Sequence, residues 1–167
     1  MGRWGAAGIV IAAALLVLWS IVGERSGDPF PVGSRLPPLA VKTSTGGIVL
    51  GSDSNLARMI LLYDRRCGHC IRELNMLEDH VDDFKGFRVV LLEIMENDGS
   101  APETASWPRL HNSKSTQFGS IERGTIRPVL GRLIVPLILV YDRQGILRER
   151  IEGVSTIGRI LLAVGKI

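Results

Sequence analysis

The chain has 167 residues, of which 46% are hydrophobic and 22% are charged, and its formal net charge is +3. This composition excludes a disordered chain, and the length suits one packed domain with an appendage. Aromatic residues make up only 5% of the chain. No basic-aromatic stripe of the kind that binds nucleic acid is present, so we expect no nucleic-acid partner.

The N-terminal segment is apolar and carries no charged residue between Trp4 and Val22. A helix over these positions would span roughly 28 Å, close to the hydrocarbon core of a bilayer. We therefore predict a single-pass membrane anchor over residues 1–23. A cleaved signal peptide is the alternative, although no small-residue cleavage site follows the apolar run. Either interpretation exports the rest of the chain if the N-terminus stays inside, to a compartment in which disulfides persist.

The remaining chain predicts a tether and an α/β domain. Residues 24–38 are rich in glycine and proline and are interpreted as the tether, so that the domain covers 39–167. The expected elements are a hairpin over 39–50, a buried strand at 59–63, a helix from the cysteines to Phe84, strands at 87–94 and 133–141, a turn at 142–145, an antiparallel strand at 146–151 and a helix at 156–164. The polar stretch 95–127 predicts only a short helix near 117–123. This order indicates an α/β sandwich with a mixed central sheet.

The two cysteines of the chain, Cys67 and Cys70, form a CGHC motif where the strand 59–63 meets the helix. Unpaired amides and the dipole at a helix N-terminus stabilise a thiolate, so Cys67 is the predicted nucleophile. Cys70, one turn further, is the predicted resolving thiol. The positive neighbours Arg66 and His69 are predicted to lower the pKa of Cys67, which makes the disulfide easier to reduce. We expect Asp64 to pair with a neighbouring arginine at the surface.

A metal site is the main alternative for the CGHC motif. A structural zinc needs four ligands, and only His69, His80 and His111 could join the cysteines. We therefore predict a redox pair without metal or cofactor, and keep as the alternative function a metal-binding or metallochaperone module that uses the same cysteines. A third possibility is a docking protein in which the motif is vestigial, and a purely structural disulfide is weaker because so short a loop removes little entropy.

The chain resembles the membrane-anchored TlpA/ResA/CcmG-like branch of the thioredoxin superfamily. The resemblance rests on the proline-rich lead-in, the hairpin, the apolar strand, the CxxC motif and Glu73, three residues after the second cysteine. Val135-Pro136, followed by a strand, an Asp-x-x-Gly turn and a strand, resembles the cis-proline loop of the family. The match covers about residues 32–94 and 131–165. It implies a thioredoxin-like three-layer sandwich after one N-terminal transmembrane helix, and thiol–disulfide oxidoreductase activity.

The resemblance also implies roles for residues and partners. Glu73 would assist proton transfer, and Val135 and Pro136 would bind the backbone of an exported, cysteine-containing protein. A membrane redox partner, a place in the bacterial inner membrane with the C-terminal domain in the periplasm, and service to cytochrome c biogenesis would fit the family. The alternatives are a solvent-facing glutamate at Glu73 and a trans proline at the start of a strand.

The chain departs from the thioredoxin pattern in ways that bear on the direction of electron flow. Arg66 stands where thioredoxins have tryptophan, and Leu61 stands where cytosolic thioredoxins have a buried aspartate. The Gly-His dipeptide resembles that of protein disulfide isomerase, which is more oxidising than the TlpA-like proteins. The sequence therefore leaves open whether the chain reduces or oxidises its partner.

Overall fold

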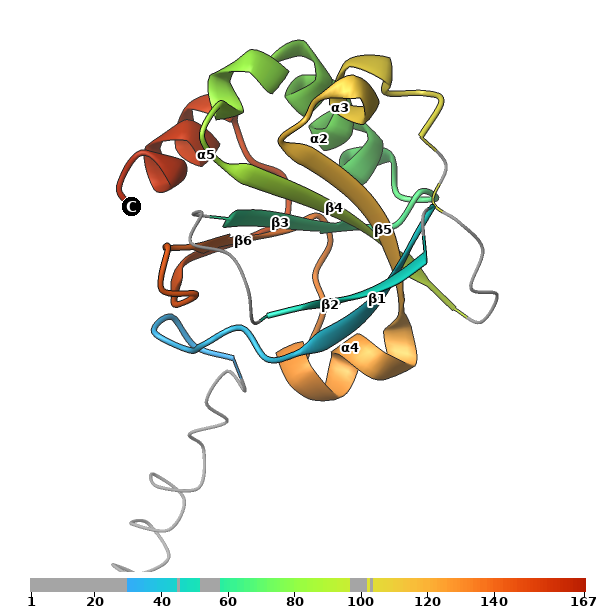
Figure 1. The fold of residues 1–167 in the computed structure, drawn as a ribbon, viewed down its shortest axis with the longest axis vertical. Helices are drawn as coiled ribbons and strands as arrows, with labels where there is room; N and C mark the ends of the chain where they lie inside the picture. Colours follow the sequence, from blue (N-terminus) through green and yellow to red (C-terminus); the bar gives the residue numbers. More distant parts are fainter. Residues whose placement is uncertain (1–29, 45, 52–57, 97–101, 103) are drawn as a thin grey trace, which may run out of the picture.

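The computed structural model describes residues 30–44, 46–51, 58–96, 102 and 104–167, which fold around one seven-stranded sheet (Figure 1). The elements in chain order are β1 (Leu39–Thr43), β2 (Gly46–Leu50), β3 (Arg58–Tyr63), α2 (Gly68–Asp79), the 3₁₀ helix η1 (Val81–Phe84), β4 (Arg88–Met95), α3 (Pro108–Asn112), β5 (Thr116–Glu122), α4 (Arg123–Leu130), β6 (Leu137–Tyr141), β7 (Leu147–Glu152) and α5 (Ile157–Val164). The anchor predicted over 1–23 lies outside the described residues. Within the described part of the chain, every helix is too short or too polar to cross a bilayer.

The sheet is mixed, with the strand order β2-β1-β5-β4-β3-β6-β7. The central strands β3, β4 and β5 run parallel, whereas β6, β7, β1 and β2 join by antiparallel pairing. Every residue of β3 is buried, as expected of a parallel strand that is covered on both faces. The α/β sandwich with a mixed central sheet, predicted from the order of elements, is therefore confirmed.

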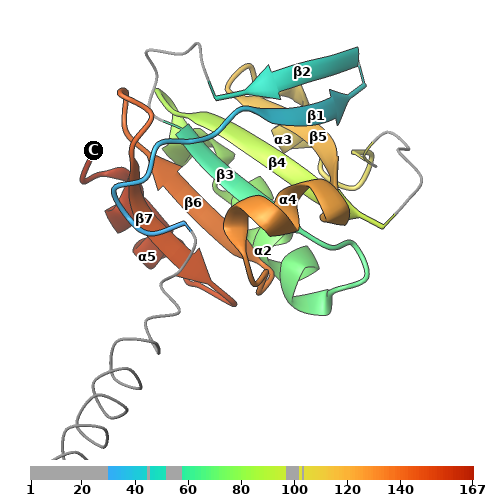
Figure 2. The same cartoon turned by 90° about the horizontal axis from the view of Figure 1, so that it is seen from below.

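Helices cover both faces of this sheet and make three layers. Helices α2, α3 and α5 lie on one face and α4 on the other (Figures 1 and 2). Successive residues of β3 alternate between the faces: Leu61 and Tyr63 belong to the core under α2, and Leu62 to the core that includes the buried residues of α4. The end of β3 is consequently held in place by packing on both sides.

The middle of the chain differs from the prediction. The prediction of a helix near 117–123 is wrong, because these residues form most of β5. This strand pairs with β4 along its whole length. Gly119 permits close packing here, since a Cβ at this position would lie 2.5 Å from Cγ1 of Val41. The pairing between distant segments, and not the local sequence, sets this strand. Helices α3 and α4 were likewise not predicted.

The folded domain also begins earlier than predicted. Phe30 and Leu36 are buried in the core on the α4 side, and the amide of Leu36 donates to the carbonyl of Gly145 at 3.1 Å. The tether predicted over 24–38 therefore overlaps the domain from Phe30 onward. Burial of an aromatic and a leucine side chain explains why a glycine- and proline-rich stretch is ordered here.

Two further boundaries differ by a few residues. The helix expected to reach Phe84 ends at Asp79 and is followed by η1. The strand expected over 133–141 begins at Leu137, directly after Pro136, because proline cannot donate a hydrogen bond within a sheet.

Candidate active site

Both cysteines lie where β3 ends and α2 begins. Cys67 is the N-cap residue of α2, and its amide donates to the carbonyl of Asp64 at 2.9 Å, which closes the turn between strand and helix. Cys70 lies in the first turn of α2 and is fully buried, whereas Cys67 is partly exposed. Both thiols are free in the structure. A partner can therefore reach Cys67 but not Cys70.

The surroundings of the two thiols move their pKa values in opposite directions. Burial works against the thiolate of Cys67, but hydrogen bonds from the amide and the thiol of Cys70 and from the amide of His69 outweigh it, so the pKa of Cys67 lies below its usual value. Burial raises the pKa of Cys70 to about 12. The His69 side chain contacts Arg72. The group that ionises first is thus the partly exposed thiol of Cys67.

Glu73 is buried on the same face of α2 as Cys70, three residues further along the helix. It is only 2% exposed, so the alternative of a solvent-facing glutamate is wrong. Its Oε2 accepts a hydrogen bond from the amide of Ser155 at 3.4 Å, and its Oε1 has no hydrogen-bond partner among the described residues. Burial raises the pKa of Glu73, and the Ser155 amide opposes this only in part. Such a carboxyl can exchange a proton with a buried thiol.

The Val135–Pro136 peptide bond is cis, as predicted. Leu137 pairs with Leu62, so Pro136 lies next to the end of β3 from which the cysteine turn departs. The carbonyl of Pro136 accepts a hydrogen bond from the amide of Gly153 at 2.9 Å. The segment that follows β7 therefore contacts the proline loop and, two residues later, Glu73.

The guanidinium of Arg66 lies in a network of ion pairs beside the cysteine turn. Its Nη2 lies 3.1 Å from Oδ2 of Asp64, which confirms the pairing expected for that acid, and 3.7 Å from Oε1 of Glu96. Arg123 joins the same two carboxylates, at 3.7 and 2.8 Å. The carboxylate of Asp64 raises the pKa of Cys67. An effect of the Arg66 side chain on Cys67 remains a prediction, because its charge is shared with two acids.

A second buried acid near the cysteines, Glu93 of β4, was missed in the sequence. It is 3% exposed, its Oε1 accepts from Nε of Arg65, and its Oε2 has no hydrogen-bond partner among the described residues. A glutamate inside the apolar run 89–94 was the available signal, because charged residues are rarely fully buried in strands without a role.

The histidines that could have completed a metal site do not join the cysteines. His80 contacts Asp83 at 3.0 Å, and the ring of His111 lies 6.4 Å from that of Phe118. Among the residues that the structure describes, no three histidine, cysteine, aspartate or glutamate side chains lie together as a metal ion would require.

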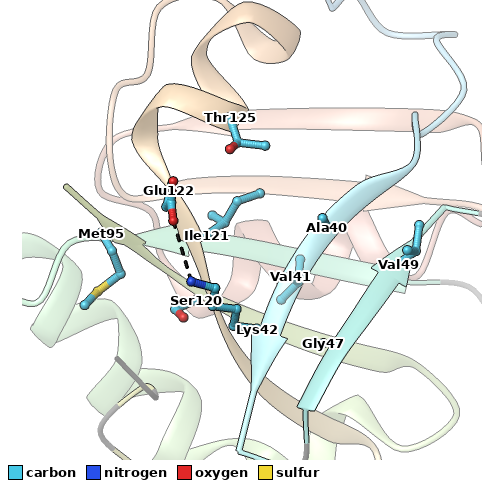
Figure 3. Close-up of a pocket in the computed structure, with 10 residues that line it drawn as sticks. All are labelled: Ala40, Val41, Lys42, Gly47, Val49, Met95, Ser120, Ile121, Glu122 and Thr125. Atoms are coloured by element: carbon cyan, nitrogen blue, oxygen red, sulfur yellow. Dashed lines mark ion pairs between the residues drawn. The ribbon is translucent and has the colours of Figure 1, made fainter. Parts of the chain in front are cut away.

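A cavity of about 340 Å³ lies between the β1–β2 hairpin, β5 and the first turn of α4 (Figure 3). An ion pair between Lys42 and Glu122, 3.6 Å long, lies at its wall (Figure 3). None of its lining residues belongs to α2 or to the cysteine turn. It is therefore separate from the cysteine turn.

The mixed sheet, the CxxC motif at the start of α2 and the cis-proline loop beside it define a thioredoxin-like fold. No protein-family model matches the chain, and no curated protein matches it. Solved structures do. The thioredoxin domain of a thiol-disulfide oxidoreductase from Bacteroides vulgatus matches with a TM-score of 0.59 at 16% identity, over 82% of this chain and 97% of that one.

Two further solved structures are similar. The exposed lipoprotein thioredoxin Etrx1 of Streptococcus pneumoniae matches with a TM-score of 0.60 at 13% identity, over 78% of this chain and all of that one. DsbF of MTB, whose structure contains mixed oxidised and reduced forms, matches with a TM-score of 0.59 at 12% identity, over 82% and 98% of the two chains. These similarities confirm the thioredoxin-like fold that the resemblance implied.

Proposed function

We propose that this chain is a membrane-tethered thiol–disulfide oxidoreductase that acts outside the cytoplasm of a bacterium, on cysteines of an exported protein. The observation that carries the proposal is the contrast between the two thiols: Cys67 is accessible with a lowered pKa, and Cys70 is buried with a pKa of about 12. An accessible thiol with a lowered pKa suits the attacking cysteine, and a buried thiol with a raised pKa suits the resolving cysteine. The names of the structural neighbours, a thiol-disulfide oxidoreductase and an exposed lipoprotein thioredoxin among them, support it.

In the reducing direction, the thiolate of Cys67 attacks one sulfur of a disulfide in the partner. The S–S bond breaks, the other partner sulfur leaves as a thiolate and takes a proton, and a mixed disulfide joins Cys67 to the partner. Cys70 then gives its proton to Glu73 and attacks the sulfur of Cys67. The mixed disulfide breaks, the partner leaves with two thiols, and the chain holds a Cys67–Cys70 disulfide.

The reverse sequence of steps oxidises a dithiol in the partner. In both directions the partner chain would lie along Val135-Pro136, next to the cysteine turn, and a membrane redox partner would restore the starting state. An anchor over residues 1–23 would keep the domain at the outer face of the inner membrane.

The test is to trap the partner in cells. With Cys70→Ser, the mixed disulfide through Cys67 cannot resolve, so a covalent adduct should appear on non-reducing gels and disappear on reduction. The double variant Cys67→Ser/Cys70→Ser is the control and should trap nothing. Absence of any adduct, together with thiols in the purified chain that do not react with oxidised glutathione, would refute the proposal. Stoichiometric zinc or copper that blocks alkylation would favour the metal-binding alternative instead.

A further inference from the structure

A cavity of about 290 Å³ lies beside the cysteine turn, between β3, β4, α2 and the segment that leads into α3. Ile71 and Asn75 line it, and they follow Cys67 along α2 at intervals of four residues. Residues at this spacing share one stripe of a helix. The cavity therefore opens on the side of α2 that carries the attacking cysteine.

The cavity and the proline loop lie on opposite sides of the cysteine turn. Glu93, which lines the cavity, belongs to β4, and Pro136 directly precedes β6; these strands flank β3 on its two edges. A partner chain that lies along Val135-Pro136 and brings its sulfur to Cys67 would place residues on the other side of that sulfur over the cavity.

The lining of the cavity contains one acid, Glu93, which is already ion-paired with one base, Arg65. One carboxylate oxygen of Glu93 is held by Arg65, and the other is buried without a hydrogen-bond partner among the described residues. A buried acceptor without a partner is costly, and a charged donor satisfies it best. The rings of Tyr63 and Trp107 form further walls, 6.4 Å apart between centroids at 72°. An aromatic ring attracts a cation that lies over its face.

The side chains that line the cavity differ in how far they are buried and in the contacts they make. The indole Nε1 of Trp107 donates to Oδ1 of Asn75 at 2.9 Å, and Trp107 is buried, so this wall is rigid. The side chain of Arg65 is 45% exposed, whereas that of Glu93 is 4% exposed, so Arg65 lies on the solvent side of the pair. Because Oε2 of Glu93 has no exposed surface, a second cation can reach it only after a wall of the cavity, such as the Arg65 side chain, moves.

We propose that this cavity, the Glu93 pocket (Tyr63, Arg65, Ile71, Asn75, Glu93, Ser106 and Trp107), is a specificity subsite for an arginine or lysine side chain near the reactive cysteine of the partner. The proposal rests on the proposed function and names a property of its substrate. A partner with a basic residue on the appropriate side of its cysteine would react faster than one with a neutral residue. An acidic residue there would meet the carboxylate of Glu93 and react more slowly.

The test uses the full chain and pairs of short peptides, each with one cysteine in a disulfide with glutathione. Within a pair the peptides differ only in arginine or its neutral isostere citrulline, placed from two residues before to two residues after the cysteine. The second-order rate constant for reduction by the dithiol form of the chain is measured for each peptide in a single turnover. At the best position the arginine peptide should react about tenfold faster, the size of one charge-assisted hydrogen bond.

Two variants decide whether Glu93 is the cause. Glu93→Gln should reduce the arginine-to-citrulline ratio to about one, and Arg65→Gln should keep or enlarge the ratio. If the Arg65–Glu93 pair served only to hold the fold, both variants would lower the melting temperature and neither would change the ratio. A ratio of one in the unaltered chain, or a ratio that Glu93→Gln does not change, would overturn the subsite. A chain that neither reduces the peptides or oxidised glutathione nor, in its disulfide form, oxidises the peptide thiols would instead overturn the proposed function, and the subsite with it.

Discussion

Glu73→Gln removes the buried acid beside Cys70 without changing its size, and it should slow one step of the reaction selectively. Burial raises the pKa of Cys70 to about 12, so its thiol is protonated at pH 7 and resolution of the mixed disulfide needs a base. A positioned general base contributes about 10²- to 10⁴-fold. We expect resolution to be about 100-fold slower in the variant, whereas attack by Cys67 should be unchanged, because hydrogen bonds that do not involve Glu73 lower its pKa.

Rapid mixing of the reduced chain with oxidised glutathione separates the two steps. Acid quenching and mass spectrometry follow the Cys67–glutathione adduct as it forms and as Cys70 displaces it. Asp79→Asn, at an exposed position on the same helix, is the matched control and should leave both rates alone. If Glu73→Gln resolves the adduct as fast as the unaltered chain, or if both steps slow equally, the role assigned to Glu73 is wrong.

The same variant makes a thermodynamic test with a definite sign. Burial raises the pKa of Glu73 in the folded chain above its value in the unfolded chain. The protonated carboxyl therefore contributes stability that is fully present below the unfolded pKa. That stability is lost as the pH rises through the folded pKa. Glu73→Gln should therefore raise the melting temperature by a few degrees at pH 7 to 8. The difference should close below about pH 4, where glutamate is protonated in both states. An equal difference at all pH values would contradict this account.

Three further predictions concern reactivity and stability. At pH 7 iodoacetamide should alkylate Cys67 at least about 100-fold faster than Cys70, measured on peptides by mass spectrometry, because only the former ionises readily; equal rates would contradict the pKa difference. Glu78→Ala should lower the free energy of unfolding in urea by about 1 kcal/mol relative to Asp79→Ala, since the Glu78 carboxylate accepts from two amides of the first turn of α3. Gly119→Ala should cost about 1–3 kcal/mol in the same assay, because its Cβ would lie 2.5 Å from a buried valine side chain of β1, and an unchanged midpoint would show that β1 can move away.

The parts of the fold that follow from local sequence were predicted well. The apolar run at Met59–Tyr63 corresponds to β3, which spans Arg58–Tyr63, because a strand buried on both faces needs a continuous hydrophobic segment. The helix after the CxxC motif follows from the periodic spacing of its apolar residues. The cis bond at Pro136 was predicted from the resemblance to a known loop. The role of Glu73 in proton transfer was predicted from the same resemblance.

The parts that depend on distant contacts were not predicted. β5 contains glycine, serine and glutamine and has a weak strand signal, yet it is held between β4 and β1. Phe30 and Leu36 pack in the core from a stretch whose composition is that of a tether. The position of Glu93 in the apolar run 89–94 indicated its burial, but its contact with Arg65 arises only when β4 lies beside the cysteine turn.

The reduction potential of the Cys67–Cys70 pair tests the central claim most directly. The full chain in detergent is equilibrated with glutathione or dithiothreitol buffers of graded potential, free thiols are trapped by alkylation, and the oxidised fraction is read by mass spectrometry. We predict one reversible two-electron transition with a midpoint between about −270 and −120 mV, the range of thioredoxin to DsbA. The more negative end would identify a reductant and the less negative end an oxidant or isomerase. A chain that keeps both thiols free across the whole range would contradict a redox function.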